Sequence, residues 1–209
     1  SCSVPMLSFA IGRNLFSCGE KQSVQLPKSN ITIVEKVDDL TPVYIFFKVN
    51  GKDTIADVNR KNTIISTNWV FNIDKRLPLK LVIPQVMKLQ EKKRKDSDYK
   101  NELAQNYYTY MDSVKKNLAF LPFTEVYYKL EKPIGTAIYF NKKNEILIEN
   151  SIVKKEQLTE LINESLPENI SKNFIFLFNK DLDFGSYIED KIFIESLNVK
   201  MNRKEEFIY

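Results

Sequence analysis

Four carboxylates near the end of the chain have the clearest capacity for chemistry: Asp181, Asp183, Glu189 and Asp190. Two carboxyl groups in one cleft can act as general acid and general base when their surroundings push their pKa values apart. The same residues also suit a turn and the start of a helix, where the helix dipole stabilises acids. We favour the second interpretation and predict no catalytic residue. A carboxylate-dependent hydrolase is the less favoured alternative.

Several other chemistries are excluded by composition. The chain of 209 residues contains no histidine, which removes Ser-His-Asp and Cys-His catalysis and histidine-ligated zinc. Neither of the glycine-rich phosphate-binding motifs is present. The net charge is only +4, and the densest basic run, at positions 92–95, is followed at once by Asp96 and Asp98. The sequence therefore predicts no cofactor, no metal and no nucleic-acid partner.

The two cysteines lie close together near the N-terminus and leave three alternatives open. Cys2 could be the acylated first residue of a lipoprotein, Cys2 and Cys18 could form a disulfide, or both could be free thiols. The first two alternatives predict a periplasmic, cell-envelope or secreted location. No apolar run approaches the ~20 residues that span a bilayer. We therefore expect membrane attachment only through a lipid on Cys2 or through an anchor outside this sequence.

The helices and strands that position these residues are predicted from the pattern of apolar residues, which alternate with polar ones in strands and recur every three or four positions in helices. Apolar residues make up 43% of the chain, which is a globular composition. Strands are predicted over 43–49, 68–73, 123–130, 137–140, 145–148 and 173–178, and helices over 79–90, 153–166 and 186–197. An apolar stripe at spacings of three and four predicts one more long amphipathic helix, and its members are Tyr99, Leu103, Tyr107, Tyr110, Val114 and Leu118.

The two halves of the chain repeat one strand–turn–helix pattern. Trp69–Leu77 aligns with Phe174–Leu182 without a gap, each residue lying 105 positions before its counterpart. Upstream, Tyr44–Phe47 aligns with Ala137–Phe140. The predicted fold is α+β, with two similar small subdomains of short strands and helices packed on one face, joined by the long amphipathic helix. The predicted boundaries are 1–22 for an N-terminal segment, 23–92, 93–120 for the connecting helix, and 121–209.

A corner after the repeated strand carries a family resemblance. In the second half, a hairpin, the helix of Gln157–Leu161 and an apolar strand lead into Asn179-Lys180-Asp181-Leu182-Asp183-Phe184-Gly185. With these features, residues 137–197 resemble the periplasmic domain of the ExbD/TolR family of biopolymer-transport proteins, and residues 43–90 resemble it more weakly. The resemblance implies a small α+β domain that associates with itself and with envelope proteins. It does not extend to proton transport, because the family's membrane helix and intramembrane aspartate are absent from this sequence.

The predicted function is that of a non-enzymatic cell-envelope interaction module acting by protein–protein association. Its partners would be envelope proteins or a second copy of the chain. The corners supply the candidate interaction residues, which are Asp74, Lys75, Asn179, Lys180, Asp181, Phe184 and Gly185. The alternative is a lipoprotein that binds a peptide or small ligand in a groove lined by the tyrosine stripe and Trp69.

Overall fold

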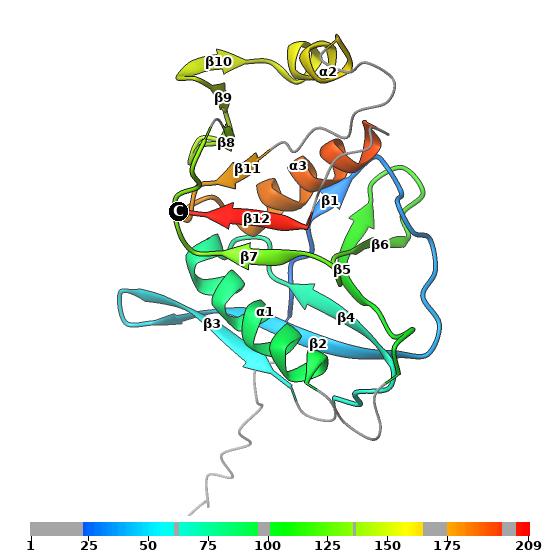
Figure 1. Ribbon diagram of the computed structural model, residues 1–209. Coiled ribbons are helices and arrows are strands. Elements are labelled where there is room, and N and C mark those ends of the chain that lie inside the picture. Colours follow the sequence, from blue (N-terminus) through cyan, green and yellow to red (C-terminus); the bar gives the residue numbers. More distant parts are fainter. Residues whose placement is uncertain (1–22, 61–62, 96–100, 136, 165–174, 198–203) are drawn as a thin grey trace, which may run out of the picture.

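The computed structural model describes residues 23–60, 63–95, 101–135, 137–164, 175–197 and 204–209. The predicted N-terminal segment, with Cys2 and Cys18, lies outside the described residues. The fold is α+β, as predicted, with two mixed sheets of six strands each. Figure 1 shows the first sheet below the second.

The first sheet contains β1 (Lys28–Ser29), β2 (Leu40–Asn50), β3 (Asp53–Asn59), β4 (Asn68–Ile73), β5 (Asn106–Asp112) and β6 (Leu118–Pro122), with helix α1 (Leu79–Arg94) between β4 and β5. The second contains β7 (Tyr127–Lys129), β8 (Ala137–Phe140), β9 (Ile146–Ile148), β10 (Ser151–Val153), β11 (Ile175–Phe178) and β12 (Glu205–Ile208). Helix α2 (Lys155–Glu164) precedes β11, and α3 (Phe184–Ser196) lies between β11 and β12.

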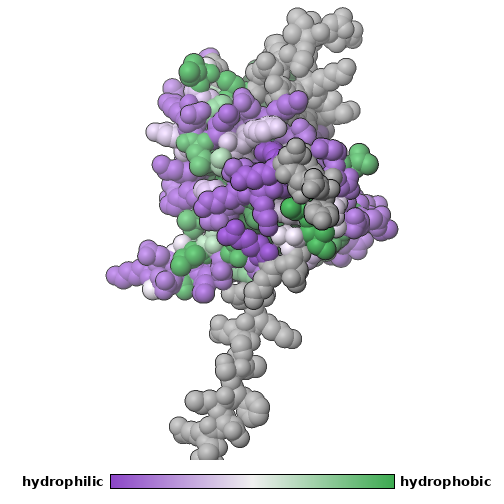
Figure 2. Space-filling model, turned by 60° about the horizontal axis from the view of Figure 1, so that its bottom comes forward, coloured by the Kyte–Doolittle hydropathy of each residue, from purple (hydrophilic) through white to green (hydrophobic). Residues whose placement is uncertain are grey.

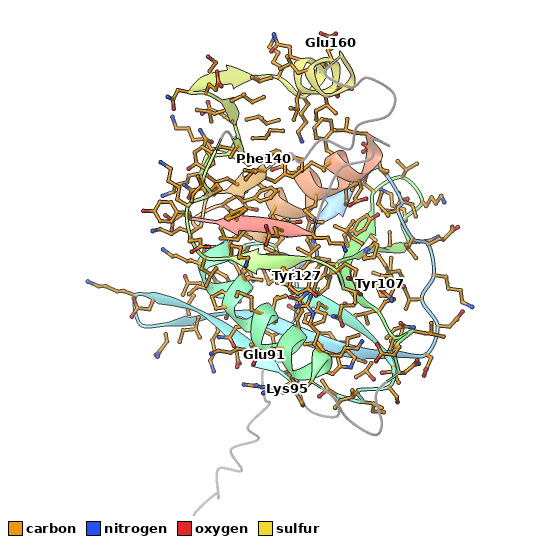
Figure 3. The ribbon with its side chains drawn as sticks, viewed as in Figure 1. Glu91, Lys95, Tyr107, Tyr127, Phe140 and Glu160 are labelled. Atoms are coloured by element: carbon orange, nitrogen blue, oxygen red, sulfur yellow. The ribbon has the colours of Figure 1, made fainter. Side chains whose placement is uncertain are left out.

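Both halves contain the same unit of four strands and one helix. The strands are ordered β3-β2-β4-β5 in the first sheet and β9-β8-β11-β12 in the second. In each, the hairpin is antiparallel and the next two strands are parallel to its first strand. The second half inserts β10 and α2, which lie at the end of the molecule away from the first half (Figures 1 and 3). Among the described residues between β3 and β4, the first half has no helix.

The strand registers correct one part of the sequence alignment. Val43 pairs with Phe71, and Ile138 pairs with Phe176, which is the counterpart of Phe71 in the second half. Pro42–Ile45 therefore corresponds to Ala137–Phe140, so the predicted alignment of Tyr44–Phe47 was wrong by two residues. Side chains alternate between the two faces of a strand, so a shift of two residues keeps each side chain on the same face. The apolar pattern therefore cannot distinguish the two alignments.

The predicted connecting helix over 93–120 is wrong. Helix α1 ends at Arg94, and strands β5 and β6 form an antiparallel hairpin in the middle of the predicted span. Aromatic and β-branched residues fill β5, and such residues favour strands. Tyr108 and Tyr110 face the core, while Leu103 and Val114 of the proposed stripe are 84% and 70% exposed. The strand forms because β4 offers β5 a parallel partner, which local periodicity does not reveal.

One apolar core joins the two halves. A single cluster of buried side chains includes Val43 and Phe71 of the first half and Phe140 and Phe178 of the second. Each half also packs its helix against a strand of the other half, since α1 contacts β7 of the second sheet and α3 contacts β1 of the first. In Figure 3, Tyr127 of β7 lies beside the C-terminal part of α1, where its ring stacks under Arg94 at 4.1 Å. On the face drawn in Figure 2, hydrophobic residues form separate patches among hydrophilic ones.

Candidate functional site

The two predicted corners meet each other inside the chain. An isolated antiparallel bridge joins Pro78 to Asp183, which are themselves counterparts in the repeat. The backbone N–H of Leu79 donates to the carbonyl of Leu182 at 2.9 Å, and that of Phe184 donates to the carbonyl of Leu77 at 2.8 Å. The junction therefore has an approximate two-fold symmetry, because each bond is the repeat-related copy of the other.

A second pair of hydrogen bonds extends this junction. The N–H of Lys80 donates to the carbonyl of Lys180 at 2.8 Å, and the N–H of Gly185 donates to the carbonyl of Lys75 at 2.9 Å. A Cβ on Gly185 would lie 3.1 Å from Cβ of Lys75, so this close approach favours glycine. Phe184 is fully buried and meets the ring of Tyr108 edge-on at 5.3 Å. Phe184 and Gly185 thus join the two halves and offer no free surface.

The Asx residues of the corners shape the turns through their side chains. Oδ1 of Asp74 accepts a hydrogen bond from the N–H of Arg76 at 3.1 Å, and Oδ1 of Asn179 accepts one from Asp181 at 2.9 Å. Burial of Asp74 opposes its ionisation, yet hydrogen bonds from Arg76 hold its pKa below the ordinary value. The Asp181 carboxylate meets Nζ of Lys80 at 2.7 Å, a contact that crosses the junction and lowers the pKa of Asp181.

A buried polar chain also crosses between the halves. The hydroxyls of Tyr108 and Tyr128 lie 2.6 Å apart, and those of Tyr128 and Tyr187 lie 3.1 Å apart. Tyr187 donates to Oε2 of Glu206 at 2.6 Å, and Lys191 forms an ion pair with the same carboxylate. Burial raises the pKa of Tyr108 and of Tyr187 well above the ordinary value, so both stay neutral. Because all five side chains are buried, this chain holds the halves together and contacts no solvent-filled hollow.

Asp181, Asp183 and Asp190 each have a partner of their own, and the charges of Glu189 and Asp183 add to the effect of burial on the pKa of Asp190. Asp183 caps α3 by accepting from the N–H of Ser186 at 2.9 Å, and Asp181 pairs with Lys80 across the junction. Asp190 is fully buried with Lys155 Nζ at 3.2 Å, although neither of its oxygens accepts a well-aligned hydrogen bond among the described residues. Burial raises the pKa of Asp190 to about 7, while Lys155 partly opposes this. No pair of these acids faces a shared cleft in the described part.

The groove expected from Trp69 and the tyrosine stripe is not formed. Trp69 is fully buried and donates from Nε1 to the carbonyl of Ile64 at 2.7 Å. Tyr107 and Tyr110 lie on a strand, where their odd spacing places them on opposite faces. Tyr110 is buried in the core, and Tyr107 packs on the outer face of the first sheet. This part of the alternative prediction is wrong.

A hollow of about 450 Å³ lies on the outer face of the second sheet, which is the face turned away from α3. Its floor comes from β8, β9 and β11 and from the last residue of the chain, and its side chains are Ala137, Tyr139, Leu147, Leu177 and Tyr209. The connection between β7 and β8 forms one wall, with Lys132, Pro133 and Gly135. The turn of Glu149 and Asn150 forms another, and both of its residues have a left-handed backbone, with φ of 48° and 67°.

The repeat shows that the apolar character of this hollow belongs to the second half alone. In the first sheet, Tyr44 lies between Asn59 of β3 and Asn72 of β4. At the corresponding positions of the second sheet, Tyr139 lies between Leu147 of β9 and Leu177 of β11. The same backbone therefore carries amides on one copy and leucines on the other.

The outer face of the first sheet is also partly covered by the chain itself. Val34 and Val37, from the extended connection between β1 and β2, pack with Val70, Tyr107 and Phe120 in a second small core. Val34 forms a backbone bridge with Phe120. In the second sheet, the connection between β7 and β8 is shorter, and its residues Leu130 and Ile134 are 51% and 97% exposed, with Ile134 lying in sequence between Pro133 and Gly135 of the hollow's wall.

The hollow was missed in the sequence because its residues lie on strands that were predicted only as core. A signal was present in β11, where Ile175, Leu177 and their neighbours are all apolar, whereas β4 carries Asn72 on its outer face. In a strand with one face on the surface, apolar and polar residues are expected to alternate along the sequence. The uninterrupted apolar run of β11 therefore indicates that its outer face is covered as well, and Leu177 on that face is only 7% exposed.

The chain matches no known protein-family model, no curated protein and no solved structure. The resemblance to the ExbD/TolR family therefore stays a prediction. Within the described ranges, no group of three or more acidic or cysteine side chains could hold a metal ion. None of the helices in those ranges has both the length and the apolar content to cross a membrane.

Proposed function

We propose that this chain is a non-enzymatic interaction protein of the cell envelope that acts by protein–protein association. Its contact surface is the hollow over β8, β9 and β11. The observation that carries this proposal is the replacement of Asn59 and Asn72 by Leu147 and Leu177 beside an equivalent tyrosine. The first half folds with amides at these places, so the shared backbone by itself does not require leucine there. Leu177 is 7% exposed and Leu147 is half-buried, so both form the floor of an apolar hollow, and an apolar hollow beside solvent supports a binding role.

The chemistry of the lining supports binding and not catalysis. Among the residues that line the hollow, Glu149 is the one carboxylate and Lys132 the one cation, and both are exposed. Acid–base catalysis by two carboxylates needs a second acid within reach of the same substrate. Tyr139 accepts a hydrogen bond from Nδ2 of Asn179 at 2.6 Å, which fixes its ring over the floor.

The partner is expected to be another envelope protein. The corner residues predicted for interaction with envelope proteins or a second copy lie at the junction of the two halves, where the backbones of Lys75, Lys180 and Gly185 are already hydrogen-bonded within one chain. The envelope location rests on the resemblance of residues 137–197 to the ExbD/TolR family and on Cys2 as a candidate for lipidation. A lipid there would place the hollow near a membrane without a spanning helix.

Site-specific photo-cross-linking in the cell of origin tests this function. A photoreactive phenylalanine analogue replaces Ile134, which lies in sequence between two residues of the wall, and in a control it replaces Val49, which is 61% exposed on the hairpin of the first sheet. We expect a discrete heavier species from position 134 and none from position 49, with mass spectrometry identifying the attached protein. The absence of a product at position 134, or equal products at both positions, would contradict the proposal.

A further inference from the structure

We infer that a second cavity, beside the C-terminal end of α1, binds a small carboxylate that carries an N–H donor next to it, as a free amino acid or the last residue of a peptide does. The cavity has a volume of about 240 Å³. Its lining comes from α1, from the connection into β5, from the first residue of β5 and from the connection between β6 and β7. It shares no lining residue with the hollow over β8, β9 and β11, so this site is independent of the proposed function and goes beyond it.

Two neighbouring cations of α1 line this cavity without a carboxylate beside them. Lys93 is only 6% exposed, and its Nζ donates to the carbonyls of Thr67 at 3.0 Å and Gln105 at 2.9 Å. These bonds occupy two of the three donors of the ammonium. Arg94 donates to the carbonyl of Thr124 at 2.7 Å, and no carboxylate among the described residues lies within 4 Å of either cation. The remaining donor of Lys93 therefore favours a ligand with a negatively charged oxygen.

The ionisation of Lys93 agrees with this geometry. Burial lowers the pKa of Lys93 to about 8, because the ammonium is withdrawn from water and is paired only with neutral carbonyls. A carboxylate in the cavity would supply the missing anion. The ring centroid of Trp69 lies 5.2 Å from Nζ of Lys93, so the one tryptophan of the chain is placed to report a ligand at this amine.

The second group of the site is the amide of Asn106, the first residue of β5. Its side chain lies on the same face of the strand as Tyr108 and Tyr110, which is the face turned to the core. Asn106 is 2% exposed and lines the cavity, and its Oδ1 accepts no hydrogen bond among the described residues. A buried acceptor without a partner is costly, so this amide favours a ligand that donates an N–H.

These groups and the size of the cavity define the class of ligand. A carboxylate pairs with Lys93, and an N–H on the neighbouring atoms of the ligand pairs with Oδ1 of Asn106. The lining also contains the exposed acids Glu102 and Glu125, which balance the charges of Lys93 and Arg94 and disfavour a multiply charged anion. The volume is below the ~300–1,000 Å³ of pockets for drug-sized ligands and well above the space that one water needs, which suits a single amino-acid unit.

Isothermal titration calorimetry of the full chain with L-amino acids provides the test, with each amino acid supplied free, N-acetylated and as the carboxamide. The first two forms keep a carboxylate next to an N–H, and the third lacks the carboxylate. We expect the carboxylate forms to bind at least about tenfold more tightly than the carboxamides and to change the emission of Trp69. Binding by the N-acetyl forms would identify the last residue of a peptide as the ligand, and binding by the free forms alone would identify a free amino acid.

The variants Asn106→Leu and Lys93→Met remove the acceptor and the ammonium, and each should weaken binding by at least about tenfold. The matched control is Lys92→Met, because Lys92 is exposed at the next position of α1 and does not line the cavity. Circular dichroism verifies that each variant is folded, and Asn106→Leu decides if Lys93→Met does not fold. Unchanged affinity in the folded variants, equal binding of the carboxamides, or no binding of any form at about 10 mM would overturn the inference.

Discussion

The two halves of this molecule agree where they touch each other and differ where they face solvent. At the junction, the hydrogen bonds of one corner are copied in the other, from Leu79 and Lys80 to Phe184 and Gly185. On the outer faces, Tyr44 and Tyr139 occupy equivalent places, but their neighbours are amides in one case and leucines in the other. The hydrogen bonds kept in both copies assemble the junction, whereas the leucines on the outer face are found in one copy only.

The same comparison applies to the helices. Position 86 of α1 is Val86, while its counterpart in α3 is Lys191, which pairs with the buried Glu206. Position 85 is Gln85, while its counterpart is the buried Asp190. The second half therefore contains buried charge where the first half is neutral, which makes its stability depend on the pairing and protonation of a few groups.

The largest expected effect comes from Lys191→Met. Removing the ammonium leaves Glu206 buried without its ion-pair partner, which should lower the free energy of unfolding by about 3–5 kcal/mol. The matched change in the first half, Val86→Met, enlarges a fully buried apolar side chain and should cost about 1–3 kcal/mol through altered packing alone. Urea unfolding followed by circular dichroism measures both. Equal losses would mean that the ion pair does not distinguish the two helices.

A smaller loss is expected from Gly185→Ala. The added Cβ would meet Cβ of Lys75 at 3.1 Å and its carbonyl oxygen at 3.4 Å, forcing the two corners apart at a cost of about 1–3 kcal/mol. At the counterpart position, Lys80→Ala removes a partly exposed ion pair and should cost less than about 1 kcal/mol. Thermal melting of the two variants compares them. If Lys80→Ala proves the more damaging, glycine is not required at the junction.

The smallest effect concerns pH and the pair Asp190 and Gln85. Because burial raises the pKa of Asp190 to about 7, the folded state holds this proton more tightly than the unfolded state. Its contribution to stability is complete below about pH 4 and is lost as pH rises through about 7. Asp190→Asn should remove this dependence and raise the free energy of unfolding at pH 8 by about 1–2 kcal/mol.

The control for this prediction is Gln85→Glu, which introduces an acid at the counterpart in α1. Gln85 is half-buried, so a carboxylate there is expected to keep its charge with little change in the pH dependence. Urea midpoints between pH 4 and 8 give the comparison. A wild-type midpoint that does not fall between pH 5 and 8 would contradict the assigned state of Asp190.

The sequence alone predicted those features that depend on neighbours along the chain. The α+β class followed from strand and helix periodicity, and the turns at Asp74 and Asn179 followed from side chains that bond two residues onward. The repeat was found because β4 with α1 and β11 with α3 keep one constant offset. These features could be predicted from the sequence because their hydrogen bonds and packing join residues that are close along the chain.

Tertiary structure decided the rest, because the deciding contacts join residues far apart in sequence. Residues 106–112 became a strand because β4 pairs with them, although an apolar stripe at helical spacing predicted a helix. The corner residues became an internal junction because the second copy folds against the first, 105 positions away. The apolar hollow lies where the outer face of the second sheet carries leucines at the places that Asn59 and Asn72 occupy in the first sheet. Spacing along the chain specifies which side chains share a face, and only the packing of whole elements specifies which faces stay open.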